Sequence, residues 1–515
     1  MATPLTSNGS RIVPATLRRE AQEQKPTLYT LTPLLDKAPF RLRVQIEFST
    51  LGANGPIRLQ MPTWSPGDYH LQNHAQFVQE LTASDVTVPG DKNPLMVTHP
   101  DADTWEVEPE QARKIEVSYT LPTTPPGFFS QNVQVLENQV FLNGTAAYLY
   151  RVGEKASPAL LRVRMPEGWQ VVTPLPARAN SEENLPQFEA SDYDTLADSP
   201  VVMAAPDALT LREFTASGVK HRIAYFGKKH LVADFDAYTP VIKRVAEAEN
   251  RIMGDSPPYK QYCFFFDVGG YGGGLEHLNS CRIAIRPSGD PVRAATFFAH
   301  EFFHLWNIKR IRPKVLGPFD YIHPPRTRNL WFAEGVTEYF AQVAVRRAEL
   351  WTEAQFLEHW HRAIGAMQNT SARRSVTADE SSLRVWEGKN SQGYGGLSYY
   401  DKGELIGLCL DLKIRAVTQN QKSLDDVMRL LMARHNLPKP GYGEDEIRNV
   451  VSEVAGQDLS AFYDTLARST QEMPFAECLG YAGLDLDLHP LPDATPEQIA
   501  LRKSWAGAFP LKDKE

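Results

Sequence analysis

The chain of 515 residues has few cysteines, no long apolar run and no excess of positive charge. Its four cysteines, Cys263, Cys281, Cys409 and Cys478, form no Cys-x-x-Cys pair. Two disulfides are compatible with that count, but the spacing does not indicate a disulfide-stapled secreted scaffold. No run approaches the ~18 apolar residues of a membrane-spanning helix, and residues 1–10 lack the apolar core of a signal peptide. We therefore expect a soluble, cytoplasmic protein with reduced thiols and no membrane partner.

The charge balance also restricts the partners. The formal net charge of -8 argues against a nucleic-acid partner, because a polyanion binds basic surfaces. The basic run Lys309-Arg310-Ile311-Arg312 could form a local basic patch, but its simplest interpretation is a solvated loop. No pattern in the sequence indicates an oligomeric state.

Alternating polar and apolar residues dominate the first part of the chain. The alternation covers residues 40–48, 114–121 and 161–165, with Pro/Gly turns between them, as expected for half-buried strands. After a polar leader at 1–30, with a short helix expected at 17–24, we predict an all-β domain over 31–228. Nothing in this domain resembles a catalytic constellation.

The hydrophobic period changes near residue 230 and becomes helical. We expect a second, mainly helical domain over 229–487 and a tail over 488–515, which makes the chain a multi-domain α+β protein. Residues 370–400 are expected to be a surface loop. The elements expected in the second domain are strands at 262–268 and 282–286 and helices at 231–253, 329–347, 401–416, 423–435, 444–455 and 459–468.

One helical stretch, residues 299–307, carries the pattern His-Glu-x-x-His. His300 and His304 are four residues apart, so they share one helix face and can bind the same metal ion. Glu301 would then stand beside the metal, where a carboxylate can act as base on a bound water. The alternative is a pair of hydrogen-bonded histidines without a metal.

A third ligand is available downstream in an apolar helix. A hydrolytic zinc site needs three protein ligands and one open position. Glu334 lies among apolar residues, and a buried carboxylate is costly unless it is paired or metal-bound. Glu338, one turn later, fits a salt-bridged surface position better than Glu334 does.

These motifs closely resemble those of the glycyl aminopeptidase family, zinc metallopeptidases of family 61 in the gluzincin group with a thermolysin-like catalytic domain. The resemblance rests on residues 300–313 and 330–335, together with Met-Pro-Thr-Trp-Ser-Pro-Gly-Asp-Tyr at 61–69 and Tyr-Tyr-Asp-Lys-Gly at 399–403. It extends over roughly residues 30–487. Family members commonly continue into a PDZ domain, but here only about thirty residues follow Leu484, fewer than a small domain needs.

The resemblance implies a role for each residue of the candidate centre. One Zn²⁺ per chain would be held by His300, His304 and Glu334, with Glu301 as general base. We further expect Glu338 to steady one of the ligand histidines.

The glycine-rich segment at 269–277 is similar to the Gly-x-Met-Glu-Asn segment of gluzincin aminopeptidases. That likeness implies that Glu276 binds the free α-amine of the substrate, with Gly273 and Gly274 lining the substrate site. A carboxylate there would pair with an ammonium group and leave room for one residue before the scissile bond. A solvent-exposed loop glutamate is the alternative.

Tyr400, immediately before Asp-Lys-Gly, matches the family tyrosine that stabilises the oxyanion. The alternative is that Tyr399 and Tyr400 are packing aromatics.

The expected function is a zinc-dependent aminopeptidase acting on peptides with a free N-terminus, with a preference for small residues such as Gly and Ala. Two alternatives stay open at this point: a zinc endopeptidase or other hydrolase on the same scaffold, and a non-catalytic peptide-binding protein.

Overall fold

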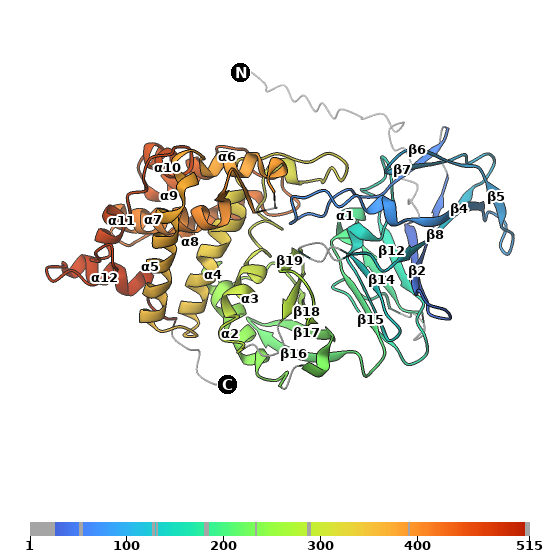
Figure 1. Cartoon of the computed structure of the whole chain (residues 1–515), viewed down its shortest axis with the longest axis horizontal. Coiled ribbons are helices and arrows are strands. Elements are labelled where there is room, and N and C mark those ends of the chain that lie inside the picture. Colours follow the sequence, from blue (N-terminus) through green and yellow to red (C-terminus); the bar gives the residue numbers. More distant parts are fainter. Residues whose placement is uncertain are drawn as a thin grey trace, which may run out of the picture.

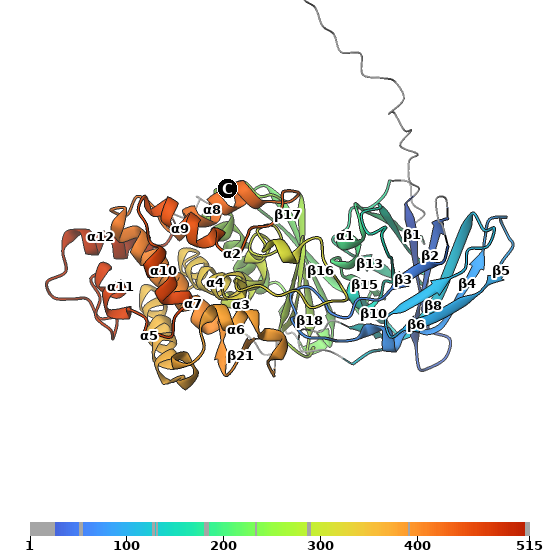
Figure 2. The same cartoon turned by 90° about the horizontal axis from the view of Figure 1, so that it is seen from above.

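The computed structural model describes residues 26–50, 55–125, 129, 132–179, 185–231, 234–285, 290–389 and 392–509. The expected helix at 17–24 lies outside the described residues. The molecule is elongated, with β-sheets at one end and helices at the other (Figures 1 and 2). A smaller sheet, green in both views, lies between them.

The N-terminal part consists of three sheets, which confirms the prediction of an all-β region. The alternation at 40–48 gives strand β2, whose apolar side chains are buried on one face. The seven-stranded sheet has the order β14 (Gln187–Ala190), β12 (Ala159–Val163), β1 (Thr27–Leu34), β2 (Arg41–Ser49), β8 (Lys114–Pro122), β4 (Gln79–Asp85) and β5 (Asn93–Leu95). The two four-stranded sheets are β13 (Gln170–Val172), β15 (Val201–Ala204), β10 (Gln139–Leu142), β9 (Val133–Val135), and β11 (Tyr150–Arg151), β3 (Ile57–Gln60), β7 (Thr104–Val107), β6 (Val97–Asp101).

The central sheet joins segments on both sides of residue 228. Its order is β16 (Thr210–Ala216), β17 (Val219–Gly227), β18 (Gln261–Val268), β20 (Ser280–Ile285) and β19 (Gly274–His277). Strand β17 pairs in parallel with β18 along its whole length. The pairing therefore favours a division between the two parts near residue 206, rather than at 228–229 as expected from the sequence.

The second part is mainly helical, as predicted. Its helices are α2 (Tyr238–Ile252), α3 (Ala295–Phe303), α4 (Val336–Arg347), α5 (Glu353–Asn369), α6 (Ala378–Leu383), α7 (Tyr399–Val417), α8 (Leu424–His435), α9 (Glu446–Ala455), α10 (Ser460–Ala467), α11 (Phe475–Tyr481) and α12 (Pro496–Trp505). A short helix, α1 (Tyr193–Ala197), belongs to the N-terminal part. The shorter turns are η2 (His74–Phe77), η3 (Gly144–Ala146), η4 (Lys229–Leu231), η5 (Lys314–Leu316), η6 (Trp331–Gly335), η7 (Ser371–Arg374) and η8 (Val385–Glu387), and a small hairpin pairs β21 (Gly393–Tyr394) with β22 (Leu397–Ser398).

The predicted boundaries differ from the structure at three places. The helix expected at 231–253 begins only at Tyr238, and Pro240 lies in its first turn, where the missing N–H leaves no helical hydrogen bond unmade. The expected loop at 370–400 contains helix α6 and the small hairpin. The expected tail contains helix α12, whose Trp505 is fully buried and donates a hydrogen bond from Nε1 to the Tyr339 hydroxyl at 3.2 Å.

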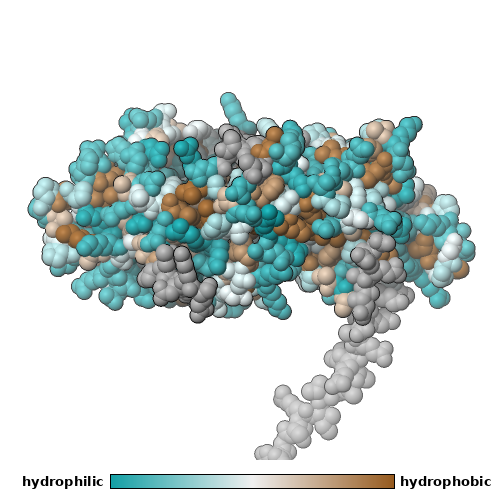
Figure 3. Space-filling view, turned by 90° about the horizontal axis from the view of Figure 1, so that it is seen from below, coloured by the Kyte–Doolittle hydropathy of each residue, from teal (hydrophilic) through white to brown (hydrophobic). Residues whose placement is uncertain are grey.

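The structure also bears on the state of the cysteines and on membrane-spanning helices. The four cysteines are buried free thiols, so none forms a disulfide. Among the described helices none is both long and apolar enough to cross a lipid bilayer. The face in Figure 3 shows hydrophobic residues interspersed with hydrophilic ones.

Candidate metal centre and substrate site

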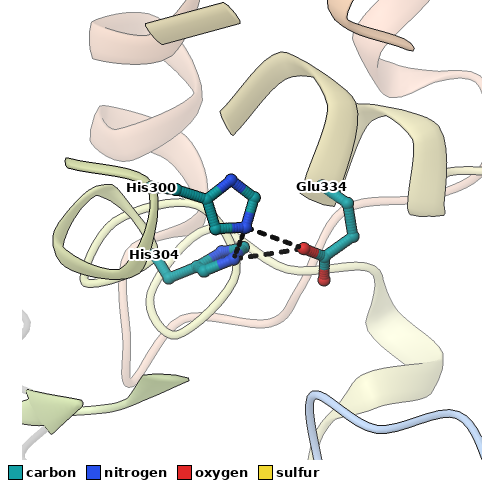
Figure 4. Close-up of side chains that lie close together, drawn as sticks. All are labelled: His300, His304 and Glu334. Carbon is teal, nitrogen blue, oxygen red and sulfur yellow. Dashed lines mark hydrogen bonds and ion pairs between the residues drawn. The ribbon is translucent and has the colours of Figure 1, made fainter. Parts of the chain in front are cut away.

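Three buried side chains, from the end of helix α3 and from the turn η6, lie close together (Figure 4). His300 lies in the last turn of helix α3 and His304 is its C-terminal cap. The Nε2 atoms of the two histidines are 3.0 Å apart. Glu334 Oε2 lies 3.1 Å from His304 Nε2 and 3.5 Å from His300 Nε2. We call His300, His304 and Glu334 the acceptor cluster.

The outer nitrogen of each imidazole is occupied by an acceptor. His304 Nδ1 lies 2.7 Å from the Asn307 carbonyl, and His300 Nδ1 lies 2.8 Å from Glu338 Oε2. A carbonyl can only accept, so His304 Nδ1 carries a proton. If both rings are neutral and protonated on Nδ1, as they would be around a bound metal, each presents a lone pair on Nε2. Two nitrogen lone pairs and one carboxylate then face the same point, which is the donor set of a zinc ligand shell. The residues present therefore fit a divalent cation.

The turn that carries Glu334 is held close to helix α7. Residues Trp331–Gly335 form a π-helical turn, a conformation that is frequent at functional sites. A Cβ atom placed on Gly335 would lie 2.4 Å from Gly403 Cα, and one placed on Gly403 would lie 2.3 Å from the Trp331 carbonyl oxygen. This glycine contact lets the backbones of η6 and α7 approach closely enough to place Glu334 and Tyr400 at the same centre.

Glu301 lies beside the acceptor cluster and packs under strand β19. A Cβ placed on Gly274 would stand 2.0 Å from Glu301 Oε1, so the glycine backbone leaves the space that the carboxylate occupies. Burial raises the pKa of Glu301 to about 7, although the two histidines of the acceptor cluster oppose the shift. A carboxyl with a pKa near neutrality can both accept and release a proton.

Tyr400 is the second residue of helix α7 and faces the acceptor cluster. Its ring stacks on the His300 ring, with centroids 6.0 Å apart and an interplanar angle of 22°. Burial, together with the charge of Glu334, raises the pKa of Tyr400 well above its ordinary value, so the hydroxyl keeps its proton. Tyr399 packs against Tyr400 at 4.9 Å and is fully buried.

Glu276 is a buried residue of edge strand β19, not a solvent-exposed loop side chain. Its side chain is 5% exposed, and Oε1 accepts no hydrogen bond from any described residue. The nearest cation is Lys309, whose Nζ lies 3.9 Å from Oε1. Lys309 and Arg310 are themselves buried, so the basic run is not the solvated loop that the sequence suggested.

The two predicted glycines differ in surroundings. Gly274 lies directly against Glu301, as described above. Gly273 lies against Phe129, and its carbonyl accepts hydrogen bonds from Arg282 Nη1 at 3.3 Å and from the Ala284 amide at 3.2 Å. The Gly273 carbonyl is therefore used within the sheet.

The N-terminal part reaches into this site, which the sequence interpretation missed. Gly67, with φ of 102°, lies so close to Glu276 that a Cβ would stand 2.6 Å from Oε2. Tyr69 packs on Trp64 and on Trp386, which lies in η8 of the helical part. Trp64 also donates from Nε1 to the Asp320 carbonyl at 2.9 Å. The sequence signal for this contribution is the motif at 61–69, which resembles the family but does not by itself indicate a contact with Glu276.

Two family models match the chain. Residues 35–205 match the peptidase M61 N-terminal domain, and residues 293–406 match M61 glycyl aminopeptidase. No curated protein matches the sequence.

Solved structures of other metallopeptidases have a similar fold. An aminopeptidase N family protein from Idiomarina loihiensis is 25% identical, with a TM-score of 0.80 over 89% of this chain and 78% of its own. An M1 zinc metallopeptidase from Deinococcus radiodurans is 13% identical, with a TM-score of 0.53 over 92% of this chain and 97% of its own. A mutant of a Deinococcus radiodurans M1 zinc metallopeptidase, bound to a Tyr-Ser-Ala substrate, is similar at 13% identity and a TM-score of 0.53 over 87% and 95%. The predicted fold class, a β N-terminal domain followed by a thermolysin-like peptidase domain, is confirmed.

Proposed function

Since the chain belongs to the M61 glycyl aminopeptidase family and is a metallopeptidase, we propose that it is a zinc-dependent aminopeptidase. It removes the N-terminal residue of peptides and prefers small residues such as Gly and Ala. We also propose that residues 31 to about 206 form the N-terminal domain and that the following residues, including helix α12 (Pro496–Trp505), form the catalytic domain.

The observation that carries the proposal is the convergence of three hydrogen-bond acceptors at one buried point. In the acceptor cluster, the His300 and His304 Nε2 atoms lie within 3.5 Å of Glu334 Oε2. Acceptors that share a point repel one another unless a cation or a proton lies between them. We infer that they hold one Zn²⁺, which when bound would polarise the scissile carbonyl and lower the pKa of the attacking water.

Glu301 is the proposed general base. Its carboxylate lies beside the acceptor cluster, within the site that the attacking water would enter. It takes the proton from the attacking water and later gives that proton to the leaving amine. Tyr400 keeps its hydroxyl proton and donates a hydrogen bond to the oxygen on which negative charge develops.

Glu276 is the proposed anchor for the substrate amine. A buried carboxylate oxygen without a donor is costly, and the ammonium group of a peptide would supply both a donor and a positive charge. Gly67 stands against the same carboxylate and closes the far side of the site.

A peptide-library digest followed by mass spectrometry, with and without a metal chelator, tests this function. We expect loss of single N-terminal residues, Gly and Ala first, and no cleavage after chelation. Cleavage of N-acetylated peptides at internal bonds would favour an endopeptidase. Binding without any cleavage in the presence of zinc would favour a non-catalytic peptide-binding protein.

A further inference from the structure

The buried Lys309 is placed between two carboxylates that come from different parts of the molecule. Its Nζ lies 3.0 Å from Asp198 Oδ1 and 3.9 Å from Glu276 Oε1. Asp198 follows helix α1 in the N-terminal part, whereas Lys309 and Glu276 belong to the catalytic part. The lysine therefore makes its hydrogen bond across the boundary between the two parts, and Glu276 receives only the longer contact.

Asp198 is itself held in place by strand β19. It accepts a hydrogen bond from the Leu278 amide at 2.6 Å, and its Oδ1 lies 3.2 Å from His277 Nδ1. Its side chain is 13% exposed. Burial would raise the pKa of Asp198, but the charge of Lys309 and the His277 contact outweigh it and lower the pKa to about 2. Asp198 is thus an ionised partner for the lysine.

The charges decide what Glu276 can bind. Asp198, Lys309 and Glu276 together carry one net negative charge, which an ammonium group can neutralise. Without the Asp198 charge, Lys309 would neutralise Glu276, and a substrate ammonium would meet a neutral pair instead of an anion. A buried lysine 3.9 Å from the amine anchor is compatible with amine binding only because a second carboxylate engages it.

We propose that Asp198 is a positioning residue for substrate binding: by engaging Lys309 it leaves Glu276 free for the substrate ammonium, so the N-terminal domain completes the amine site. This proposal rests on the proposed role of Glu276. It assigns a role in substrate affinity to a domain that, by sequence, contains no catalytic constellation.

Steady-state kinetics on alanine p-nitroanilide test the proposal. In Asp198→Asn we expect KM to rise on the order of tenfold, because a buried charge partner is lost. We expect kcat to stay within about twofold, because Asp198 does not touch the reacting carbonyl. Asp192→Asn is the matched control: it lies at the other end of helix α1, where asparagine also caps well, and its KM should equal that of the wild type.

The double variant Asp198→Asn/Lys309→Met separates charge positioning from a structural role. Removing the lysine leaves Glu276 as the remaining charge of the three, so KM should fall back to within about threefold of the wild type. If Asp198 only holds the two domains together, the double variant will be at least as impaired as the single one, and the proposal is then wrong.

Two further variants keep the test decisive. If Asp198→Asn does not fold, as judged by its melting temperature, Lys309→Met alone is measured; we expect its KM to lie below that of the wild type, and an increase would overturn the proposal. Glu276→Ala reports on the amine anchor itself. If Glu276→Ala leaves KM unchanged, the proposed function fails; if it raises KM while Asp198→Asn does not, only the positioning role fails.

Discussion

The acceptor cluster and the site around Glu276 are both buried and acidic, yet they are assembled differently. The acceptor cluster and its neighbour Glu338 come from residues 300–338 of one domain, and each histidine is braced by an acceptor on its outer nitrogen. Glu276, in contrast, lies between Gly67 of one domain and Lys309 of the other, and Lys309 is engaged by Asp198 of the first domain. We propose that the cluster holds a cation, whereas Glu276 keeps one carboxylate oxygen without a donor from the described residues, which we propose the substrate ammonium supplies.

We expect the largest loss of activity from a substitution of Glu301, the proposed general base. Glu301→Gln should lower kcat on the order of 10³-fold, because the amide cannot accept the water proton. Zinc content and melting temperature should stay close to those of the wild type, since Glu301 is not in the acceptor cluster. Glu358→Gln on the exposed face of helix α5 is the control. Activity retained in Glu301→Gln would contradict the assignment of the base.

The next largest effect is expected at the close contact between Gly335 in η6 and Gly403 in helix α7, which positions Glu334 and Tyr400. Gly335→Ala would place a methyl group 2.4 Å from Gly403 Cα, and the backbones must separate. We expect a loss of about 1–3 kcal/mol in the free energy of unfolding and reduced activity. Gly365→Ala in the middle of helix α5 has no atom within 4 Å and should gain about 0.5–1 kcal/mol. Urea unfolding measures both, and equal effects would show that the close approach is unimportant.

The contact between Glu338 and His300 can be tested through zinc affinity, separately from substrate binding at Glu276. Glu338→Gln should weaken zinc binding by about 10–100-fold, because the amide holds the imidazole tautomer less firmly. Competition with a metallochromic chelator gives the affinity. KM with saturating zinc should change little, in contrast to Glu276→Ala. An unchanged zinc affinity would remove Glu338 from the metal centre.

The smallest expected effect is on the pH dependence of the free energy of unfolding, to which ionised Asp198 contributes. The pKa of Asp198 is lowered from 3.8 to about 2 in the folded protein. A lowered pKa contributes stability above pH 4, about 2 kcal/mol here, which is lost as the pH falls towards 2. The difference in unfolding free energy between wild type and Asp198→Asn, measured in chelator, should therefore shrink from pH 5 to pH 3. A difference independent of pH would show that Asp198 does not titrate as a paired carboxylate.

Local patterns predicted much of this molecule. The alternation at 40–48 and 114–121 and the helical periods from residue 401 onward correspond to observed elements. The expected domain boundary and the expected tail differ from the structure because both depend on contacts between distant segments. Strand β17 joins the central sheet by pairing with β18, and Trp505 of the expected tail is buried against Tyr339. Hydrophobic period reports which face of a segment is buried, but not which partner buries it.

The acceptor cluster could be predicted as a hypothesis before the structure, because i, i+4 spacing on one helix and a buried glutamate on the next already favour a metal. The surroundings of Glu276 could not be predicted in this way, because they depend on how distant segments pack. Gly67, Asp198 and Lys309 are separated by more than a hundred residues from one another. The salt bridge between Asp198 and Lys309 and the close approach of Gly67 to Glu276 leave no periodic signal in the sequence. The burial of Lys309 could not be predicted for the same reason. A basic run is usually solvent-exposed, because a buried charge is costly without an ionised partner. Here the partner is Asp198, which comes from the other domain.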